Sequence, residues 1–314
     1  MKPNKLPGVS VFVLHYNDAV SSSMCLKSLY KNLPKYPGPY ELYLIDNGST
    51  DDSVDALKKE FPKLKVIGYG DHLQVGKSFA RAAIKAKYDL LYLTPNDMEA
   101  DPDFLEPLVR HFRREDVFAV NPTALSKNEN ESYRRNVASR RFGLFSMYRR
   151  ASQKPAYSFS PAILGAFNRK KFLEFGGPDP LYHPTFYDDY DLGFCAWKRG
   201  WKVIYEPKSI VMHRHKGQLK KVIGERESSI VDMRNRHLFI WKNYDNVSFV
   251  GYMFYLPFIL LLGTLKRGPD YIYSFCLALK KVSDVREKRR KEERVRKYSD
   301  SEIFAMCSGH VNED

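Results

Sequence analysis

Carboxylate side chains recur in this chain directly after apolar runs that read as strands. The acidic segments are Ile45-Asp46-Asn47-Gly48-Ser49-Thr50-Asp51, Pro95-Asn96-Asp97 and Tyr187-Asp188-Asp189-Tyr190-Asp191. Open α/β sheets bind ligands outside the carboxyl ends of their strands. This order therefore predicts carboxylate sites along the carboxyl edge of a sheet.

The first segment has the chemistry to recognise a nucleoside. Asp46 ends an apolar run, and Asn47-Gly48-Ser49 has the composition of a turn, so the carboxylate projects from the edge of the sheet. There it can accept hydrogen bonds from a nucleoside. The alternative is that Asp46 and Asp51 only cap the following helix.

The second segment has the chemistry to hold a divalent cation. Asp97 follows the apolar run Leu90–Leu93 and a proline. One aspartate suffices where a diphosphate and water supply the other oxygen ligands. The alternative is a solvated loop acid, because Glu99, Asp101 and Asp103 lie close by in the sequence.

Two histidines could complete such a site. His213 and His215 follow a strand-like run, and in extended chain their side chains point to the same side. A neutral imidazole can ligate a metal or contact phosphate. The alternative is a pair of surface or packed histidines.

The third segment offers a general base. Asp188, Asp189 and Asp191 stand at a predicted helix start, where the helix dipole stabilises carboxylates. Capping alone explains only part of this cluster. A carboxylate within hydrogen-bond reach of a substrate hydroxyl can remove its proton.

The elements that must position these residues alternate between strands and helices. We expect strands at Val9–Tyr16, Tyr40–Ile45, Leu64–Ile67 and Leu90–Leu93, and helices at Ala19–Asn32, from Asp51-Asp52-Ser53 through Phe61, and at Ser78–Ala86. The alternation predicts an α/β fold with a mostly parallel sheet flanked by helices.

The middle of the chain is less regular. Residues 126–157 are polar and rich in arginine, and without a clear period they predict a mobile excursion. Order returns at Ala162–Phe167. We then expect helices at Lys170–Phe175 and Asp188–Lys198 and strands at Lys202–Tyr205 and Ser209–Met212.

Composition bounds the class of protein. The chain has 314 residues, 43% of them hydrophobic, and a formal charge of +14, which fits a globular protein with an anionic partner. The cysteines Cys25, Cys195, Cys276 and Cys307 have no metal-ligand or redox spacing, which favours a reducing cytosol. No secretory signal is visible at the N-terminus.

The last part of the chain has the composition of a membrane-associating tail. Residues 246–265 carry no charge, and a dense run of lysine and arginine covers residues 280–297. A transmembrane helix, an interfacial helix pair and a buried core helix are the alternatives. We favour an interfacial form on an anionic membrane surface, because Pro257 and the glycines interrupt the apolar run.

Together these motifs resemble the family 2 glycosyltransferases with a GT-A fold, especially the bacterial rhamnosyltransferase-like branch. The resemblance covers about Val9–Tyr244 and rests on the Val9–Asn17 and Leu44–Asp51 segments. Pro95-Asn96-Asp97 stands at the DXD position, with proline in place of the first aspartate. Asp188 replaces the glutamate of a Glu-Asp motif, and His72 and Gln74 replace asparagine and glycine.

The resemblance implies a set of site residues. Asp189 is the catalytic base, with Asp188 and Asp191 beside it, and Gly165 and Asp188 face the acceptor. Asp97 and His213 bind Mn²⁺ or Mg²⁺. The implied nucleotide-sugar-binding residues are Tyr16, Asn17, Asp46, Asn47, Gly76, Lys77, Arg81, Asn96, Asp97, Arg234 and Arg236.

The implied activity is a single inverting displacement. The donor is a dTDP-, UDP- or GDP-sugar and the acceptor a hydroxyl of a lipid-linked or polysaccharide molecule, as in lipopolysaccharide biosynthesis. We expect a catalytic domain at residues 1–244, with a nucleotide-sugar half at about 1–125 and an acceptor half at about 158–244. Residues 245–314 form the amphipathic, hydrophobic helical extension, which attaches the protein to the cytoplasmic face of the inner membrane.

Other classes of protein remain as alternatives. The charge and the many tyrosines and arginines suggest a nucleic-acid-binding protein, but the basic residues do not form a recognisable module, and no nucleic acid is expected. A nucleotidyltransferase would carry a glycine-rich phosphate loop after the first strand, and His15-Tyr16-Asn17-Asp18 is not one. A catalytically inactive scaffold is suggested by the missing first acid of the DXD position.

Overall fold

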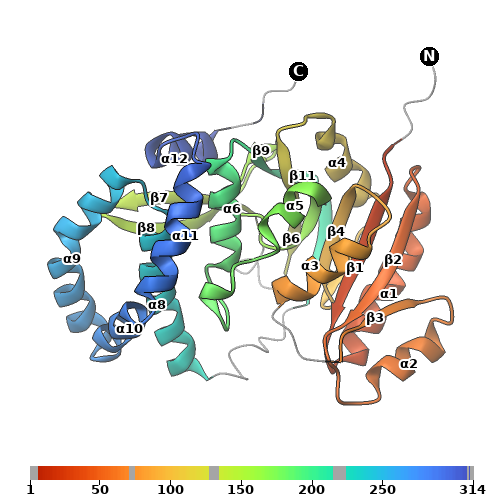
Figure 1. Ribbon diagram of the computed structural model, residues 1–314. Coiled ribbons are helices and arrows are strands. Elements are labelled where there is room, and N and C mark those ends of the chain that lie inside the picture. The colour runs from red at the N-terminus through yellow and green to blue at the C-terminus, as the bar shows by residue number, and fades with distance from the viewer. Residues whose placement is uncertain (1–5, 71–74, 127–133, 215–223, 310, 312–314) are drawn as a thin grey trace.

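A sheet of nine strands runs through the computed structural model, which describes residues 6–70, 75–126, 134–214, 224–309 and 311 (Figure 1). The hydrogen-bonding order is β3-β2-β1-β4-β10-β6-β11-β5, with β9 paired to β11. The strands are β1 (Val9–His15), β2 (Tyr40–Asp46), β3 (Lys65–Gly68), β4 (Leu90–Pro95), β5 (Met98–Ala100), β6 (Val117–Leu125), β9 (Ala156–Tyr157), β10 (Gly165–Asn168) and β11 (Lys202–His213).

Most strands run in the same direction, as the sequence predicts. β3, β2, β1 and β4 pair in parallel, and β11 pairs in parallel with β6. β10 runs antiparallel between β4 and β6, so β4 and β6 also share a direction. The carboxyl ends of all these parallel strands consequently meet at one edge of the sheet.

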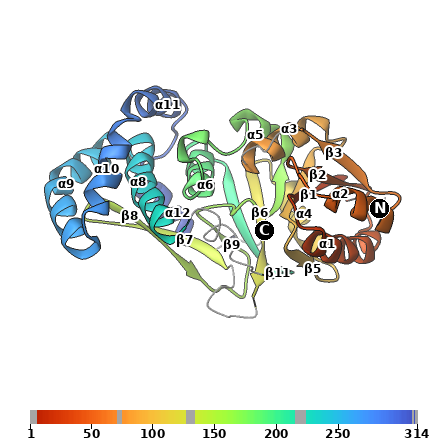
Figure 2. The same cartoon turned by 90° about the horizontal axis from the view of Figure 1, so that it is seen from below.

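Helices cover both faces of the sheet, as the view from below shows (Figure 2). One core packs α1 (Ala19–Asn32), α2 (Ser53–Glu60) and α4 (Leu105–Arg110) against the sheet. The other packs α3 (Val75–Lys85), α5 (Arg169–Phe175) and α6 (Asp188–Lys198). β1 is almost entirely buried, because helices lie on both of its faces.

The prediction of an irregular, mobile excursion at residues 126–157 is wrong for its described part. β7 (Arg135–Arg141) and β8 (Leu144–Arg150) form an antiparallel hairpin. Val137 and Phe145 are buried, and so is Arg135, whose guanidinium donates to the carbonyls of Ser308 and Gly309. The sequence shows no alternating apolar pattern here, because Arg135 occupies an interior position of β7. Residues 127–133 lie outside the described part of the chain.

A smaller difference concerns the last strand. Lys202–Tyr205 and Ser209–Met212 were expected as two strands, whereas β11 is one strand with a register shift between Glu206 and Ile210. The irregularity stands where Pro207 interrupts the apolar pattern, because proline cannot donate to the ladder.

The C-terminal helices share a third core with the hairpin and α6. They are α8 (Glu225–Asn243), α9 (Asn246–Arg267), α10 (Asp270–Leu279), α11 (Val282–Arg294) and α12 (Asp300–Ser308). Phe145, Trp197, Phe239 and Ile303 all belong to this core. The predicted boundary at residue 244 therefore crosses a continuous core, and α9 lies at the end of the molecule opposite to α1.

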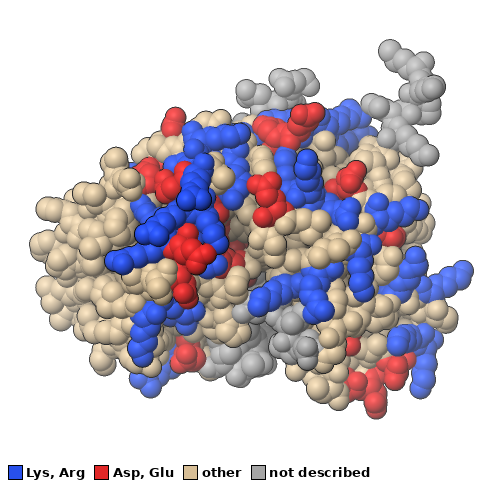
Figure 3. Space-filling model, viewed as in Figure 1, with Lys and Arg blue, Asp and Glu red and all other residues tan. Residues whose placement is uncertain are grey.

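α9 exposes most of its apolar side chains. Among the described residues it is the only helix long and apolar enough to cross a membrane, and 17% of its most apolar stretch is buried. The surface over α9 and α10 carries few charges on the face shown in Figure 3. Parts of the basic run point inward instead: Arg289 and Arg296 donate to the carbonyls of Trp241 and Asn243.

Candidate active site

Two loops at the carboxyl edge of the sheet are tied together by Asn17. Its Nδ2 donates to Thr50 Oγ1 at 3.2 Å, and its Oδ1 accepts from the Thr50 backbone N–H at 2.8 Å. Asp46 Oδ1 accepts from the backbone N–H of Ser49 at 3.0 Å. Tyr16 stands beside them with 43% of its surface exposed. The predicted nucleoside segment is thus a preformed rim.

The helix-capping alternative applies to only one of the two acids. Asp51 Oδ1 accepts from the backbone N–H of Ser53, the first residue of α2, at 3.1 Å. Asp46 bonds within its own turn. It is not needed to cap α2.

A buried polar chain supports this rim from below. His15 Nδ1 lies 2.7 Å from Ser22 Oγ, and its Nε2 lies 2.8 Å from Ser53 Oγ. Asn96 Nδ2 donates to the same Ser22 Oγ at 3.0 Å. Burial lowers the pKa of His15, although nearby carboxylates oppose the change, so the ring is neutral at pH 7. The ends of β1 and β4 and the start of α2 are therefore held in fixed relation.

Asn47 and the segment after β3 join the same support. Asn47 is buried, and Ser78 Oγ in α3 donates to its Oδ1 at 2.5 Å. The Arg81 guanidinium lies 4.2 Å from the ring centroid of Tyr69. Lys77 is exposed at the start of α3. His72 and Gln74 lie outside the described residues.

Asp97 and His213 meet at the same edge. Asp97 Oδ2 lies 3.0 Å from His213 Nε2, although the two residues are 116 positions apart. The contact follows from topology, because β5 directly after Asp97 pairs with the end of β11. A carboxylate and an imidazole fit two positions around a divalent cation. Within the described residues no cluster of three or more metal-binding side chains occurs, and His215 lies outside them.

The start of α6 has an unusual backbone. Phe186 and Tyr187 both have left-handed conformations, with φ of 66° and 69°. Asn235 in α8 holds the preceding loop, since its Nδ2 lies 2.8, 2.7 and 3.0 Å from the carbonyl oxygens of Tyr182, Thr185 and Phe186. Consecutive left-handed residues cost free energy and concentrate at functional sites.

Asp189 has the environment of a general base. Ser160 Oγ donates to its Oδ2 at 3.0 Å. Burial, followed by the negative charge of Asp188, raises the pKa of Asp189 to about 7. Burial also raises the pKa of Asp188. A carboxylate that titrates near neutral pH accepts a proton more readily than an ordinary aspartate.

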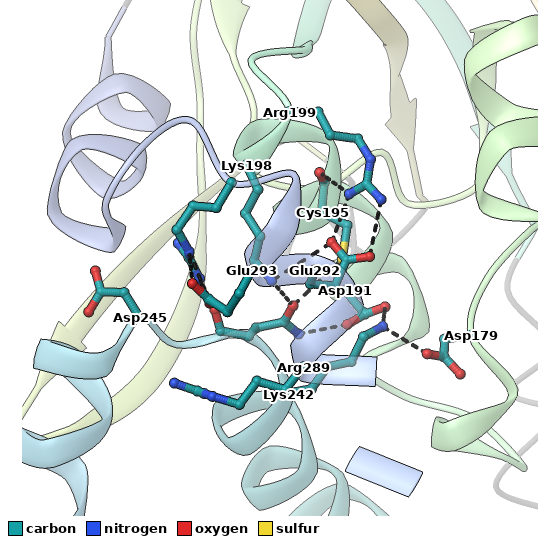
Figure 4. A network of polar contacts seen from close by, with 12 residues as sticks. Asp179, Asp191, Cys195, Lys198, Arg199, Lys242, Asp245, Arg289, Glu292 and Glu293 are labelled. Carbon is teal, nitrogen blue, oxygen red and sulfur yellow. Dashed lines mark hydrogen bonds and ion pairs between the residues drawn. The ribbon is translucent and has the colours of Figure 1, made fainter. Parts of the chain in front are cut away.

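Asp191 does not join this pair, which corrects its predicted catalytic role. Its Oδ1 accepts from Tyr182 and Asn243, and its Oδ2 lies 2.6 Å from Lys242 Nζ. Figure 4 shows this buried ion pair, which Asp179 extends on the other side of the lysine. Two positions after Asp189 the helix faces the interior, so the third acid of the motif is structural.

A pocket joins the donor-side and acceptor-side segments. It has a volume of about 130 Å³ and is lined by Gly76, Pro178, His183 and Asp188 among others. Arg234 Nη2 donates to the carbonyl oxygen of His183 at 2.5 Å, at the edge of this pocket. Gly76 from α3 and Asp188 from α6 thus line one pocket, and their predicted donor and acceptor roles stay predictions. Lys77 lines a neighbouring, highly charged cavity instead.

Two other predicted residues have different surroundings. Arg236 Nε donates to the Tyr187 hydroxyl at 3.0 Å, and the side chain lines an apolar cavity that Arg234 does not reach. Gly165 has a φ of 123°, and a Cβ there would lie 2.3 Å from the carbonyl oxygen of Val120. Sheet packing alone requires glycine at this position, and its predicted contact with the acceptor stays a prediction.

Sequence reasoning missed several residues that hold the site. Ser160, His15 and Asn235 all act through contacts between segments distant in the chain. His15 had a local signal, because it ends a strand beside Tyr16 and Asn17. Ser160 had none.

Comparison with known proteins identifies relatives. The model of the family described as glycosyl transferase family 2 matches residues 10–176. Polypeptide N-acetylgalactosaminyltransferase 8 of Drosophila melanogaster is 27% identical over 67% of this chain and 38% of its own length. Undecaprenyl-phosphate 4-deoxy-4-formamido-L-arabinose transferase of Pseudomonas syringae pv. syringae (strain B728a) is 26% identical over 43% of this chain and 41% of its own. The chain spans about two fifths of these relatives.

Solved structures share the fold. The crystal structure of GalNAc-T7 with UDP, GalNAc and Mn²⁺ matches 98% of this chain and 57% of its own, with a TM-score of 0.68 and 18% identity. The mannosyltransferase PcManGT from Pyrobaculum calidifontis, in complex with GDP-Man and Mn²⁺, matches 96% and 87%, with a TM-score of 0.55 and 16% identity. The predicted GT-A fold is confirmed.

Proposed function

This chain belongs to glycosyl transferase family 2, and from that premise we propose that it transfers a sugar from a nucleoside diphosphate donor to a hydroxyl group by a single inverting displacement. The observation that carries the proposal is the contact between Asp97 and His213 at 3.0 Å, on the sheet edge that also holds the Asp46 rim. Open α/β sheets bind nucleotides outside the carboxyl ends of their strands, which is where these residues lie.

The donor binds along that edge. Asp46 and Asn17 receive the nucleoside, and Lys77, Arg81 and Arg234 supply positive charge for the phosphates. Nucleoside diphosphates in the two structural neighbours, UDP in one and GDP-Man in the other, support this placement. We propose UDP-, GDP- or dTDP-sugars as candidate donors.

A divalent cation, Mn²⁺ or Mg²⁺, is the cofactor, and Asp97 and His213 hold it together with the donor phosphates. When bound, the cation stabilises the negative charge that develops on the leaving diphosphate. The Mn²⁺ in both structural neighbours supports this assignment. Because Pro95 replaces the first acid of the DXD position, Asp97 is the main carboxylate ligand.

Asp189 removes the proton of the acceptor hydroxyl as its oxygen attacks the anomeric carbon. Ser160 orients the carboxylate, and burial together with the charge of Asp188 keeps its proton affinity high. The proton ends on Asp189, the new glycosidic bond forms, and the bond to the diphosphate breaks. No covalent intermediate with the protein is required.

The acceptor is a lipid-linked or polysaccharide molecule at the cytoplasmic face of a membrane. The exposed apolar face of α9 and the basic residues of α11 support peripheral attachment. The name of the Pseudomonas relative includes undecaprenyl phosphate, which supports a lipid-linked acceptor. A rhamnosyl donor remains one proposal among several sugars.

Calorimetric titration tests the donor site. UDP, GDP and dTDP are titrated into the full chain with Mn²⁺, with Mg²⁺ and with EDTA, and into the Asp97→Ala variant. We expect one nucleotide to bind in the presence of metal, and its affinity to fall in EDTA and in Asp97→Ala. Equal donor affinity in wild type and Asp97→Ala would refute the metal assignment. No nucleotide binding at all would favour an inactive scaffold or a nucleic-acid-binding protein.

The stereochemical proposal has its own test. NMR of the product anomeric proton, taken early in the reaction, reports whether the configuration of the donor sugar is inverted. Retention of configuration would exclude the single displacement by Asp189 while leaving the donor site intact.

A further inference from the structure

A groove lies between the β7–β8 hairpin, α9 and α10, away from the pockets described above. Its volume is about 710 Å³, within the range of small-molecule sites. Phe142 comes from the hairpin, Phe254, Phe258 and Leu262 from α9, and Tyr271 from α10. The three α9 side chains are between 60% and 71% exposed. The groove is therefore an apolar surface open to solvent and not part of the core.

The close packing of the hairpin tip against α9 forms one wall. Gly143 has a φ of 74°, and a Cβ there would lie 2.5 Å from the Tyr252 Cα. Glycine therefore lets the turn sit directly on α9. The neighbouring Phe142 ring stacks edge-on against Tyr255, 5.6 Å between centroids, and stays 59% exposed.

Positive charges line the same groove. Arg236, Lys266 and Arg267 contribute to its surface. Burial raises the pKa of Tyr187 to about 12, and the charges of Arg236 and Arg267 oppose that rise, so both guanidinium groups act on the same tyrosine. Within the described part of the chain, no ion pair is found for Lys266 or Arg267, and the nearby Asp270 pairs with Arg226. The groove therefore combines an apolar wall with two cations, Lys266 and Arg267, that have no ion pair among the described residues, while Arg236 lies 4.0 Å from the carboxylate of Asp232.

The rest of α9 indicates where the groove opens. Val247, Val250 and Leu265 are 82%, 67% and 75% exposed and lie on the same helix, outside the groove. An apolar helix face of this kind is stable against a membrane interface. A lipid in that membrane can enter the groove sideways, with its chain on the phenylalanines and its phosphate on the cations.

The cations also connect the groove to the catalytic helix. Arg236 donates to the Tyr187 hydroxyl, and Tyr187 directly precedes Asp188 and Asp189. A phosphate held by Arg236 would consequently lie one side chain from the start of α6. A bulk membrane lipid would not need its phosphate near the start of α6. An acceptor would need it there, because its sugar must reach Asp189.

We propose, on the basis of the proposed function, that this groove binds the hydrocarbon chain and phosphate of a lipid-linked acceptor. Arg236, Lys266 and Arg267 bind the phosphate, while Phe254, Phe258 and Leu262 contact the chain. The groove thus selects a long-chain lipid phosphate over a soluble sugar acceptor.

Titration with farnesyl phosphate, below its micellar concentration, tests the site in the full chain. Farnesol and inorganic phosphate are the matched probes for chain and charge alone. We expect farnesyl phosphate to bind about 10-fold more tightly than farnesol, which corresponds to one charge-assisted hydrogen bond. Inorganic phosphate should not bind measurably. Equal binding of farnesol and farnesyl phosphate would overturn the role of the cations.

Variants on one helix separate the groove from a general membrane face. Leu262→Glu and Arg267→Glu should each weaken farnesyl phosphate binding by about 10-fold or more. Val247→Glu should leave it unchanged and should weaken only the binding of phosphatidylglycerol vesicles. If Leu262→Glu binds farnesyl phosphate like wild type, or if Val247→Glu weakens this binding as much as Leu262→Glu does, the groove is not the site and the surface is a membrane anchor only.

Donor binding keeps this test independent of the proposed function. All three glutamate variants should retain wild-type affinity for the nucleotide identified with Mn²⁺, which also shows that they fold. A chain that binds farnesyl phosphate but no nucleotide would refute the glycosyltransferase site and leave the groove standing. A chain that binds nucleotide but no farnesyl phosphate would do the opposite.

Discussion

The carboxyl edge of the sheet and the block of C-terminal helices treat charged side chains in opposite ways. Asp97 at the sheet edge faces His213, and Asp189 at the start of α6 accepts a hydrogen bond from Ser160; among the described residues neither carboxylate pairs with a lysine or an arginine. In the helical block, Asp179, Asp191 and Lys242 are buried and paired with one another. One region leaves carboxylates able to react, and the other uses them to hold helices together.

Two pKa shifts of opposite sign make the comparison quantitative. Burial and the charge of Asp188 raise the pKa of Asp189 to about 7. Burial would also raise the pKa of Asp179, but the charge of Lys242 and its hydrogen bonds with Lys242 and Lys288 outweigh it and hold the pKa at about 2. The difference is a neighbouring cation, which a structural carboxylate has and a general base lacks.

Removing the proposed base, Asp189, should have the largest effect on activity. Asp189→Asn keeps the size of the side chain but cannot accept the proton, so kcat should fall by about 100- to 10,000-fold while donor affinity stays unchanged. Initial rates and nucleotide titration measure the two quantities. Asp191→Asn is the matched control on the same helix, and it should lower stability with only a small effect on kcat. Equal losses of kcat in Asp189→Asn and Asp191→Asn would contradict the distinction between a reactive and a structural carboxylate.

Removing the buried cation should have the largest effect on stability. Lys242→Met leaves Asp179 and Asp191 without their shared lysine, at a cost of about 3–5 kcal/mol in the free energy of unfolding. Denaturant unfolding at pH 7 measures this difference. A cost near zero would mean that the ion pair does not hold α6 to α8.

The pH dependence of that cost has a defined sign. A carboxylate whose pKa is lowered on folding stabilises the protein above its unfolded pKa of about 4 and loses this contribution as the pH falls toward 2. The difference between wild type and Lys242→Met should therefore be large at pH 7 and shrink between pH 4 and pH 2. A difference independent of pH would attribute the loss to packing.

A smaller change should shift the pKa of Asp189 without removing the carboxylate. Ser160→Ala deletes the hydrogen bond that favours the ionised form of Asp189, so the pKa of Asp189 rises further. Because the ionised form is the base, kcat/KM should increase with pH through about 7 in wild type, and the midpoint should move upward by up to about 1 pH unit in the variant. Ser160→Thr keeps a hydroxyl and should restore the wild-type profile. An unchanged midpoint in Ser160→Ala would exclude this orientation of Asp189.

The sequence predicted the sheet edge well because its signals are local. Apolar runs followed by Asp46, Asp97 and Asp189 identify strand ends and a helix start, and parallel topology then brings strand ends together. The family resemblance added the roles. Patterns within a few residues were sufficient to locate the strand ends, whereas the roles rest on the resemblance alone.

The helical block could not be predicted in the same way. Asp191 reads as a third catalytic acid, and only the packing of α8 against α6 shows that Lys242 neutralises it. Arg135 reads as part of a disordered basic loop, yet it caps the end of α12 more than 170 residues away. Contacts of this kind depend on the folded chain, and no local pattern encodes them.

The smallest expected effect comes from an exposed ion pair in the same helical block. Arg226 donates two hydrogen bonds to Asp270 at 2.8 and 2.7 Å, a two-point contact, but its side chain is 78% exposed. Solvent screens both charges, and holding a long side chain costs entropy, so Arg226→Ala should leave the unfolding midpoint within experimental error. Comparison of Arg226→Ala with Lys242→Met shows whether burial or hydrogen-bond geometry decides how much an ion pair stabilises the protein. A loss comparable to that of Lys242→Met, abolished by high salt, would show that the charges of this block act as one network and that the contrast with the sheet edge does not depend on burial.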